Sequence, residues 1–368
     1  MVKKVYRKLN KYCPLPVMII YAFFLISGVV HLISVNSVEF SDFFNENISA
    51  VGRAFLAKAT NVLPFSLAET VIMFLPIIVV LLICGSVIAN RKSAAAASRY
   101  LCWLFAVITL FYSIFVFNFA TAYQGTSLEE KLNINRRKVS AEELYQTAVI
   151  LNGELKKLGG DINYKYLSES VMPYSLNEMN IKLNDTYEAV ADEYPFLSRL
   201  RSNVKYILLS EPMTYTHISG VYTFYTGEAN LNINFPDYTL PYTAAHELSH
   251  QRGIAREDEA NFMAFLICIS CEDAYIKYSG YISMFEYVLN ALYGADEKLY
   301  AEILADIDLA VRHEMIAYNN FFEKYRKSVA SNVSSAVNDT YLKIQGQEEG
   351  TKSYGRVIDL AVAYYISE

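Results

Sequence analysis

TAAHELSHQRGIAREDEANFMAF, residues 243–265, contains His246 and His250 with Glu247 beside the first of them, the spacing H-E-x-x-H. On a helix, residues four apart lie on the same face, so both imidazoles can bind one zinc ion at the usual distance of about 2.0–2.1 Å. Glu247 is then placed beside the pair, where a base can take a proton from a water on the metal. Pro241 favours the first turn of such a helix. The pattern predicts a zinc site with Glu247 as general base.

A catalytic zinc site needs a third protein ligand. Gly253 can end the first helix, and a second helix is then expected to open with carboxylates in its first turn, among them Glu257 and Glu259. Arg256 lies between the two helices, but arginine stays protonated and cannot bind zinc. The third ligand is therefore expected from the acidic residues that follow it.

The second half of the stretch resembles a zincin signature, E-x-x-A/S-D/N, in which the glutamate is the third zinc ligand. The matching residues are Glu257, Ala260 and Asn261. The resemblance implies Glu257 as the ligand, with Glu259 as the alternative, and Asn261 as a hydrogen-bond partner of a ligand histidine. The gap before Glu257 is shorter than in glutamate-ligand zincins. The opening H-E-x-x-H-x-x-G is similar to that of metzincins, whose third ligand would fall at Arg256.

Outside this stretch, the chain of 368 residues is 53% hydrophobic and has a net charge of −6. Without a long basic run beyond the N-terminus, nucleic-acid binding has no electrostatic support. Three apolar runs, at about 14–35, 66–89 and 100–122, are long enough to cross a bilayer of roughly 30 Å. The lipid bilayer is therefore an expected partner, and 1–122 an expected membrane anchor.

Positive charges predict the orientation of these spans. They occur before the first span, at Lys3, Lys4, Arg7, Lys8 and Lys11, and between the second and third, at Arg91, Lys92 and Arg99. Both segments are expected in the cytoplasm, which places residues 123–368 outside. In the loop at 36–65, Phe40, Phe44, Ile48, Val51 and Phe55 follow the spacing of one apolar helical face. Such a face suits a helix on the membrane or under the following domain, or simple packing between span ends.

After residue 122 the pattern is that of a folded domain. Ser140 and Glu143 predict a capping box for a helix at 140–158. Aromatic and branched residues predict strands within 204–215 and 220–235, and the remainder after 241 is expected to be helical. The fold class is therefore α+β: three transmembrane helices, then a mostly helical, zincin-like domain with a small β-sheet.

By resemblance to zincins, the strand before the active-site helix is expected to bind substrate through its backbone. The candidate is 226–234, with Gly227 allowing close approach and Glu228 or Asn230 reaching a peptide, although an internal strand fits the pattern as well. Donors for an oxyanion come from His217, Tyr225, Tyr354 and Arg356, none of which stands out.

The whole chain resembles an uncharacterised bacterial family of membrane proteins, domain of unknown function 3810. The matching stretches are Pro64–Leu67, Ser219–Val221, Thr226–Asn230, His246–Asn261 and Ser353–Arg356. The resemblance implies a membrane-anchored, zincin-like metallopeptidase acting on a peptide or protein. The alternative is a non-enzymatic receptor or scaffold that keeps a structural zinc site. Glu247 distinguishes the two, because a structural site does not need a base that is not a ligand.

Overall fold

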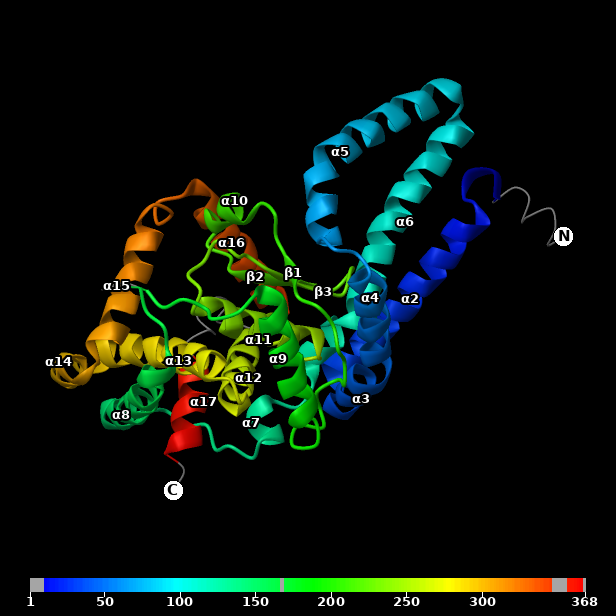
Figure 1. The fold of residues 1–368 in the computed structure, drawn as a ribbon. Helices are drawn as coiled ribbons and strands as arrows, with labels where there is room; N and C mark the ends of the chain where they lie inside the picture. The colour runs from blue at the N-terminus through cyan, green and yellow to red at the C-terminus, as the bar shows by residue number, and fades with distance from the viewer. Residues whose placement is uncertain (1–9, 166–168, 346–355, 367–368) are drawn as a thin grey trace. The chain divides into compact units, whose positions relative to one another are not determined.

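The computed structural model describes residues 10–165, 169–345 and 356–366, and its chain forms two compact units (Figure 1). The first unit contains residues 1–125 together with 223–227, and the second contains 126–222 and 228–368. The predicted boundary after residue 122 lies three residues from this division. The short segment 223–227 was expected in the second unit and groups with the first instead.

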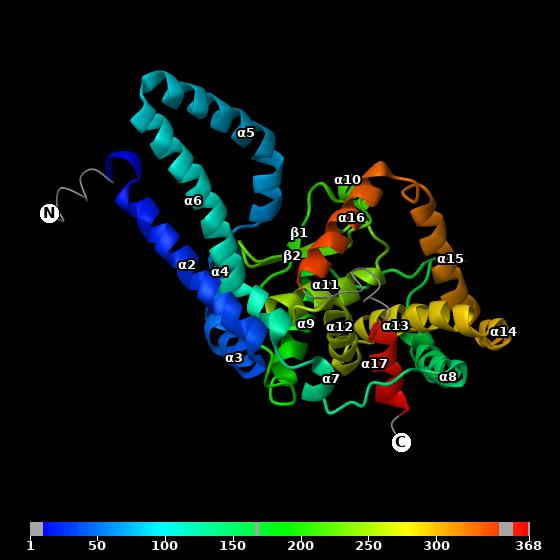
Figure 2. The ribbon, with the colours of Figure 1, turned by 180° about the vertical axis from the view of Figure 1, so that it is seen from behind.

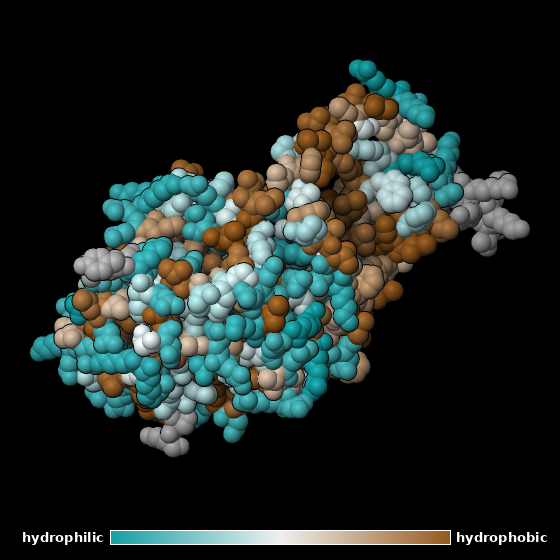
Figure 3. Space-filling model, in the orientation of Figure 1, coloured by the Kyte–Doolittle hydropathy of each residue, from teal (hydrophilic) through white to brown (hydrophobic). Residues whose placement is uncertain are grey.

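Three helices of the first unit are long and apolar enough to cross a membrane: α2 (Leu15–Asn36), α5 (Leu67–Lys92) and α6 (Ala94–Asn118). Ser66 and Ser93 cap α5 and α6, since each side chain accepts a backbone N–H three residues on. The Ser93 cap explains why the third span begins at 94 rather than 100. The apolar side chains of α5 face outward, and its surface is mostly brown in Figure 3. The three predicted spans are confirmed as helices of the required length and composition.

The loop between α2 and α5 is helical in three parts. α3 (Val38–Phe43) runs into a π-helical turn (Phe44–Ser49) and then α4 (Ala50–Asn61), and a 3₁₀ turn (Ala120–Gln124) follows α6. The π turn changes the helical phase, so the predicted apolar face is divided. Phe44 is buried, whereas Val51 and Phe55 are exposed.

The second unit is mostly helical with one small sheet. Its elements are α7 (Leu128–Lys131), α8 (Ala141–Leu158), a 3₁₀ turn (Gly159–Asp161), α9 (Leu176–Ala189), β1 (Lys205–Tyr206), α10 (Ser210–Thr214), β2 (Gly220–Thr223, whose last residue groups with the first unit), β3 (Glu228–Leu231), α11 (Thr239–Gln251), α12 (Glu257–Ser270), α13 (Ala274–Ala295), α14 (Glu297–Asp306), α15 (Leu309–Glu323), α16 (Val329–Ile344) and α17 (Arg356–Tyr365). The predicted capping box of α8 is present. The mostly helical class with a small sheet is confirmed.

The sheet has the order β1-β3-β2, with β1 parallel to β3 and Lys205 opposite Asn230. One prediction fails here, and the structure decides between two alternatives. Residues 210–214 form α10 rather than a strand, because Pro212 cannot donate a ladder hydrogen bond and fits the first turn of a helix. Of the two alternatives for 226–234, the internal strand agrees with the structure and the substrate strand does not, because β3 has a neighbour on each side and Asn230 donates to the Val221 carbonyl.

The core of the second unit lies where α13 packs against α8, α11 and α12 (Figures 1 and 2). Most of α12 is buried on every side, which explains why its sequence is apolar around the helix after its acidic first turn. The helix pair α11–α12 is therefore held rigidly between α13 and β3.

Candidate metal centre

The two histidines of H-E-x-x-H lie on α11, which α9 supports from behind. Tyr187 of α9 donates its hydroxyl hydrogen bond to the Ala245 carbonyl at 2.7 Å and lies 2.8 Å from Ser249 Oγ. The Arg252 guanidinium, fully buried at the end of α11, stacks 3.9 Å above the Tyr187 ring. These contacts fix the rotation of α11 and so the direction of both imidazoles.

His246, His250 and Glu257 converge on one point. Nε2 of His246 lies 3.4 Å from Glu257 Oε2, and Nε2 of His250 lies 3.7 Å from Glu257 Oε1. For tetrahedral ligands about 2.0–2.1 Å from a zinc ion, the ligand atoms are about 3.3–3.4 Å apart. The His246 separation equals this value and the His250 separation is slightly longer, and both are too long for strong hydrogen bonds. In the part of the chain that the structure describes, no other group of three such side chains meets in this way.

The cluster is electrostatically complementary as well as compact. Burial by itself raises the pKa of Glu257, but the two imidazoles, His250 first, hold it well below its usual range. Burial lowers the pKa of His250, and the Glu257 carboxylate outweighs this and raises it to about 9. The carboxylate is therefore ionised and strongly attracts positive charge at the point where the three side chains meet.

His250 is oriented by a backbone carbonyl. Its Nδ1 lies 2.7 Å from the Ile254 oxygen, which directs Nε2 toward Glu257. Gly253 makes this possible, because its φ of 108° turns the chain back under the histidine, as the sequence predicted. The role expected for Asn261 thus belongs to Ile254. The Asn261 side-chain nitrogen and His246 Nδ1 are both buried and make no hydrogen bond to the described residues.

Glu247 is buried beside the cluster and touches strand β2. The Tyr222 backbone N–H donates a hydrogen bond to its carboxylate, and Gly220 packs on it so closely that a Cβ there would lie 2.6 Å from Oε1. Its other oxygen, Oε2, is buried without a hydrogen-bond partner among the described residues. Burial raises the pKa of Glu247. Sequence reasoning missed this contact, since Ser219–Val221 shows only a glycine before a strand.

The other candidate residues lie elsewhere. Glu259 accepts hydrogen bonds from the Leu128 N–H and Arg256, so the alternative third ligand is not in the cluster. His217 Nε2 lies 2.8 Å from the Tyr325 carbonyl, and Tyr225 packs on Phe111 in the first unit. Arg356 begins α17 near Asp258, whose pKa burial raises to about 6, partly opposed by the charges of Arg136 and Arg356. Tyr354 and the N-terminal charges at residues 3–8 lie outside the described residues.

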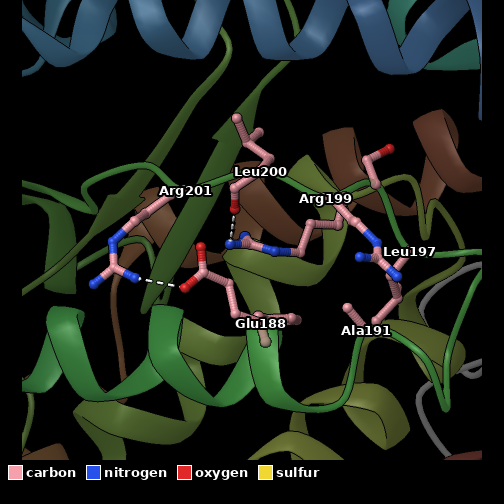
Figure 4. Close-up of a pocket in the computed structure, with 9 residues that line it drawn as sticks. Glu188, Ala191, Leu197, Arg199, Leu200 and Arg201 are labelled. Carbon is pink, nitrogen blue, oxygen red and sulfur yellow. Dashed lines mark hydrogen bonds and ion pairs between the residues drawn. The ribbon is translucent and has the colours of Figure 1, made fainter.

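A cavity of about 310 Å³, lined by the end of α9, by residues 197–201 and by Arg252, contains none of the cluster residues (Figure 4). Its arginines already have partners: Arg201 binds Glu188 at 2.8 Å, Arg199 binds Asp192, and Arg252 donates to the Leu200 carbonyl. With these charges neutralised or hydrogen-bonded, the cavity offers little attraction to an anion.

A family model described as a protein of unknown function, DUF3810, matches residues 41–362. The chain belongs to this family. The match includes α4, two of the three apolar spans and the whole α11–α12 pair, so the cluster is part of the DUF3810 region. No curated protein and no solved structure matches the chain. The family description gives no activity, so a function can be inferred only from the residues of the site.

Proposed function

We propose that the protein is a membrane-anchored, zinc-dependent metallopeptidase. The proposal rests on one observation: His246, His250 and Glu257 converge on one point, and the buried carboxylate of Glu247 lies beside them without belonging to that group. The three side chains are the donor set of a zincin site, with two imidazoles and one carboxylate. Bound there, zinc would supply Lewis-acid chemistry and lower the pKa of a coordinated water toward about 7.

The residues of the chain then have separate roles. His246, His250 and Glu257 hold the ion, and the Ile254 carbonyl keeps His250 turned toward it. Glu247 accepts the proton when water attacks a peptide carbonyl and returns it to the leaving amine. Its open Oε2 supplies the acceptor, while the Tyr222 N–H and Gly220 hold the other side of the carboxylate in place.

The alternative function is a receptor or scaffold with a structural zinc site. Structural sites are usually closed by four protein ligands, whereas three side chains meet here. A fourth position left for water and a base next to it both favour hydrolysis. The substrate class that suits this chemistry is a peptide or protein.

Glu247→Gln tests the function. The variant keeps the side-chain shape and all three ligands but removes the proton acceptor. The purified full chain should therefore retain its zinc, measured by mass spectrometry, and lose hydrolysis of a peptide library. The full chain is used because 223–227 groups with the first unit and would lose its packing in a fragment that begins at 123.

The ligands provide the matched comparison. His246→Ala, His250→Ala and Glu257→Ala should lower zinc content and activity together, while Glu259→Ala should retain the zinc. Loss of zinc in Glu259→Ala with full zinc in Glu257→Ala would reassign the third ligand. If wild type binds zinc and Glu247→Gln changes no hydrolysis, the scaffold function replaces the peptidase.

We also propose that the second unit lies outside the cytoplasmic membrane. The support is the positive charge between the second and third spans, where Arg91 and Lys92 end α5. A reporter fused at Ser93 should behave as cytoplasmic and one fused after residue 125 as exported. The reverse pattern would place the candidate site in the cytoplasm.

A further inference from the structure

Helix α4 has the polarity of its two faces reversed relative to a helix of a water-soluble protein. The face that packs inside the first unit includes Arg53, Ser49 at the preceding turn and Thr60, all buried. Arg53 donates to Asn45 Oδ1 at 2.7 Å and to the Asn118 carbonyl at 3.0 Å. Ser49 lies 3.3 Å from Thr121 Oγ1. The interior side of α4 is therefore hydrogen-bonded and polar.

The opposite face is exposed and mostly apolar, with Lys58 as its one charged residue. Val51 and Phe55 of α4 are four residues apart and share one side of the helix with Val62, which directly follows its last turn, while Ile48 ends the π turn just before it. Lys58 lies on the same side, where its long aliphatic chain can carry the ammonium group away from the apolar residues. The exposed fractions of Ile48, Val51, Phe55 and Val62 are 39%, 67%, 70% and 80%. Figure 1 shows α4 beside the lower part of α6, and the view from behind in Figure 2 agrees. We name these four residues the α4 stripe.

In water this arrangement has two free-energy costs, because a charged group is buried and large apolar side chains are exposed. In contact with lipid it becomes favourable. Outward apolar groups need no burial against protein there, and polar groups must find partners inside the unit, as Arg53 and Ser49 do. We propose that the α4 stripe contacts the acyl chains of the bilayer, so that the loop between the first two spans is itself part of the membrane anchor.

The lipid bilayer is the occupant because the stripe continues a surface of the same kind. α4 belongs to the same compact unit as α2, α5 and α6 and packs against α6. The three long helices expose Leu, Ile, Val and Phe in the same way, with none of the most apolar window of α5 buried. The inference concerns the anchor alone and does not depend on zinc or on hydrolysis.

Tryptophan fluorescence tests this directly, because Trp103 is the only tryptophan of the chain. In a Trp103→Phe background, Phe55→Trp is reconstituted as the full chain in vesicles of phosphatidylcholine, with and without bromine on the acyl chains. The expected result is a blue-shifted emission that loses most of its intensity in brominated vesicles. Val51→Trp, on the same stripe, should give the same result if Phe55→Trp fails to fold.

Two controls bracket the measurement. Leu81→Trp, exposed on α5, should be quenched, and Lys157→Trp, exposed on α8, should not. Quenching of the stripe positions to the extent seen at Leu81→Trp supports the proposal. Emission that is red-shifted and unquenched would show water at the stripe and overturn it. Blue-shifted emission that bromine leaves unchanged would show that protein, such as a second copy, covers the stripe, and would overturn it as well.

Discussion

The Arg53 cluster of the first unit and the histidine–glutamate cluster of the second both bury charged side chains, but their polar atoms are hydrogen-bonded to different extents. In the first, the two terminal nitrogens of Arg53 donate to oxygens of Asn45 and Asn118. In the second, Glu247 Oε2 and His246 Nδ1 are buried without hydrogen-bond partners among the described residues, and the ligand atoms stand apart from one another. The difference separates two uses of buried charge. Buried polar groups that have hydrogen-bond partners stabilise the fold. Buried polar groups without such partners are maintained by the rest of the fold, which is typical of functional sites.

This contrast agrees with the surroundings of each group. The Arg53 cluster joins the π turn to the end of α6, so its contacts connect segments far apart in sequence. The open atoms of the candidate site, on His246, Glu247 and Asn261, lie within the α11–α12 pair, which Tyr187 and Arg252 support. The candidate site can leave atoms unsatisfied because its scaffold does not rely on them.

The strongest expected effect comes from breaking the closed cluster. Arg53→Met retains much of the side-chain volume but removes the guanidinium that donates to Asn45 Oδ1 and to the Asn118 carbonyl. We expect a loss of roughly 3 kcal/mol in stability, measured as a lower thermal unfolding temperature of the full chain in detergent. Lys58→Met, on an exposed position of the same helix, is the control and should change little. If Arg53→Met unfolds at the same temperature as wild type, the hydrogen bonds of Arg53 do not stabilise the first unit.

A smaller effect, visible in activity rather than stability, is expected from Gly220→Ala. The added Cβ would lie 2.6 Å from Glu247 Oε1, so the carboxylate must move. A displacement near 1 Å at the reacting groups costs about 100-fold in rate, and zinc content should stay unchanged because Gly220 touches no ligand of the cluster. The control is Gly153→Ala in α8, where the new Cβ meets nothing within 4 Å. Full peptide hydrolysis by Gly220→Ala would show that the position of Glu247 is not critical.

The smallest effect concerns Glu286 of α13, a carboxylate that accepts a hydrogen bond from the Tyr238 hydroxyl at 3.2 Å. Burial raises the pKa of Glu286 to about 7, against the opposing effect of that hydrogen bond. Because the folded-state pKa exceeds the unfolded value of 4.5, the stability contributed by the protonated carboxyl is fully present below pH 4.5 and lost as pH rises through about 7.

Glu286→Gln should therefore be more stable than wild type by roughly 1–2 kcal/mol at pH 8 and equally stable near pH 4. The glutamine oxygen still accepts from Tyr238, so packing is preserved. Chemical unfolding of both proteins across this pH range measures the difference. A constant difference at every pH would trace the effect to packing rather than to the buried charge.

Local spacing determined much of this molecule. Residues four apart share a helical face in any environment, so His246 and His250 had to lie together once α11 formed. Long apolar runs become helices that hide their backbone polar groups, which made the three spans predictable. Ser140 and Glu143 were enough to predict the start of α8, because a capping box is an interaction within one helical turn.

The tertiary structure decided what depends on segments distant in sequence. Glu257 and Glu259 look alike in the chain, and only the turn at Gly253 and the packing of α12 bring one to the histidines and direct the other to Leu128. The same holds for Gly220 on Glu247, for the central place of β3 and for the reversed faces of α4. None of these contacts could be predicted from the sequence. Helical or strand periodicity shows which residues share a face, whereas the segment that packs against that face depends on the packing and hydrogen bonding of the whole unit.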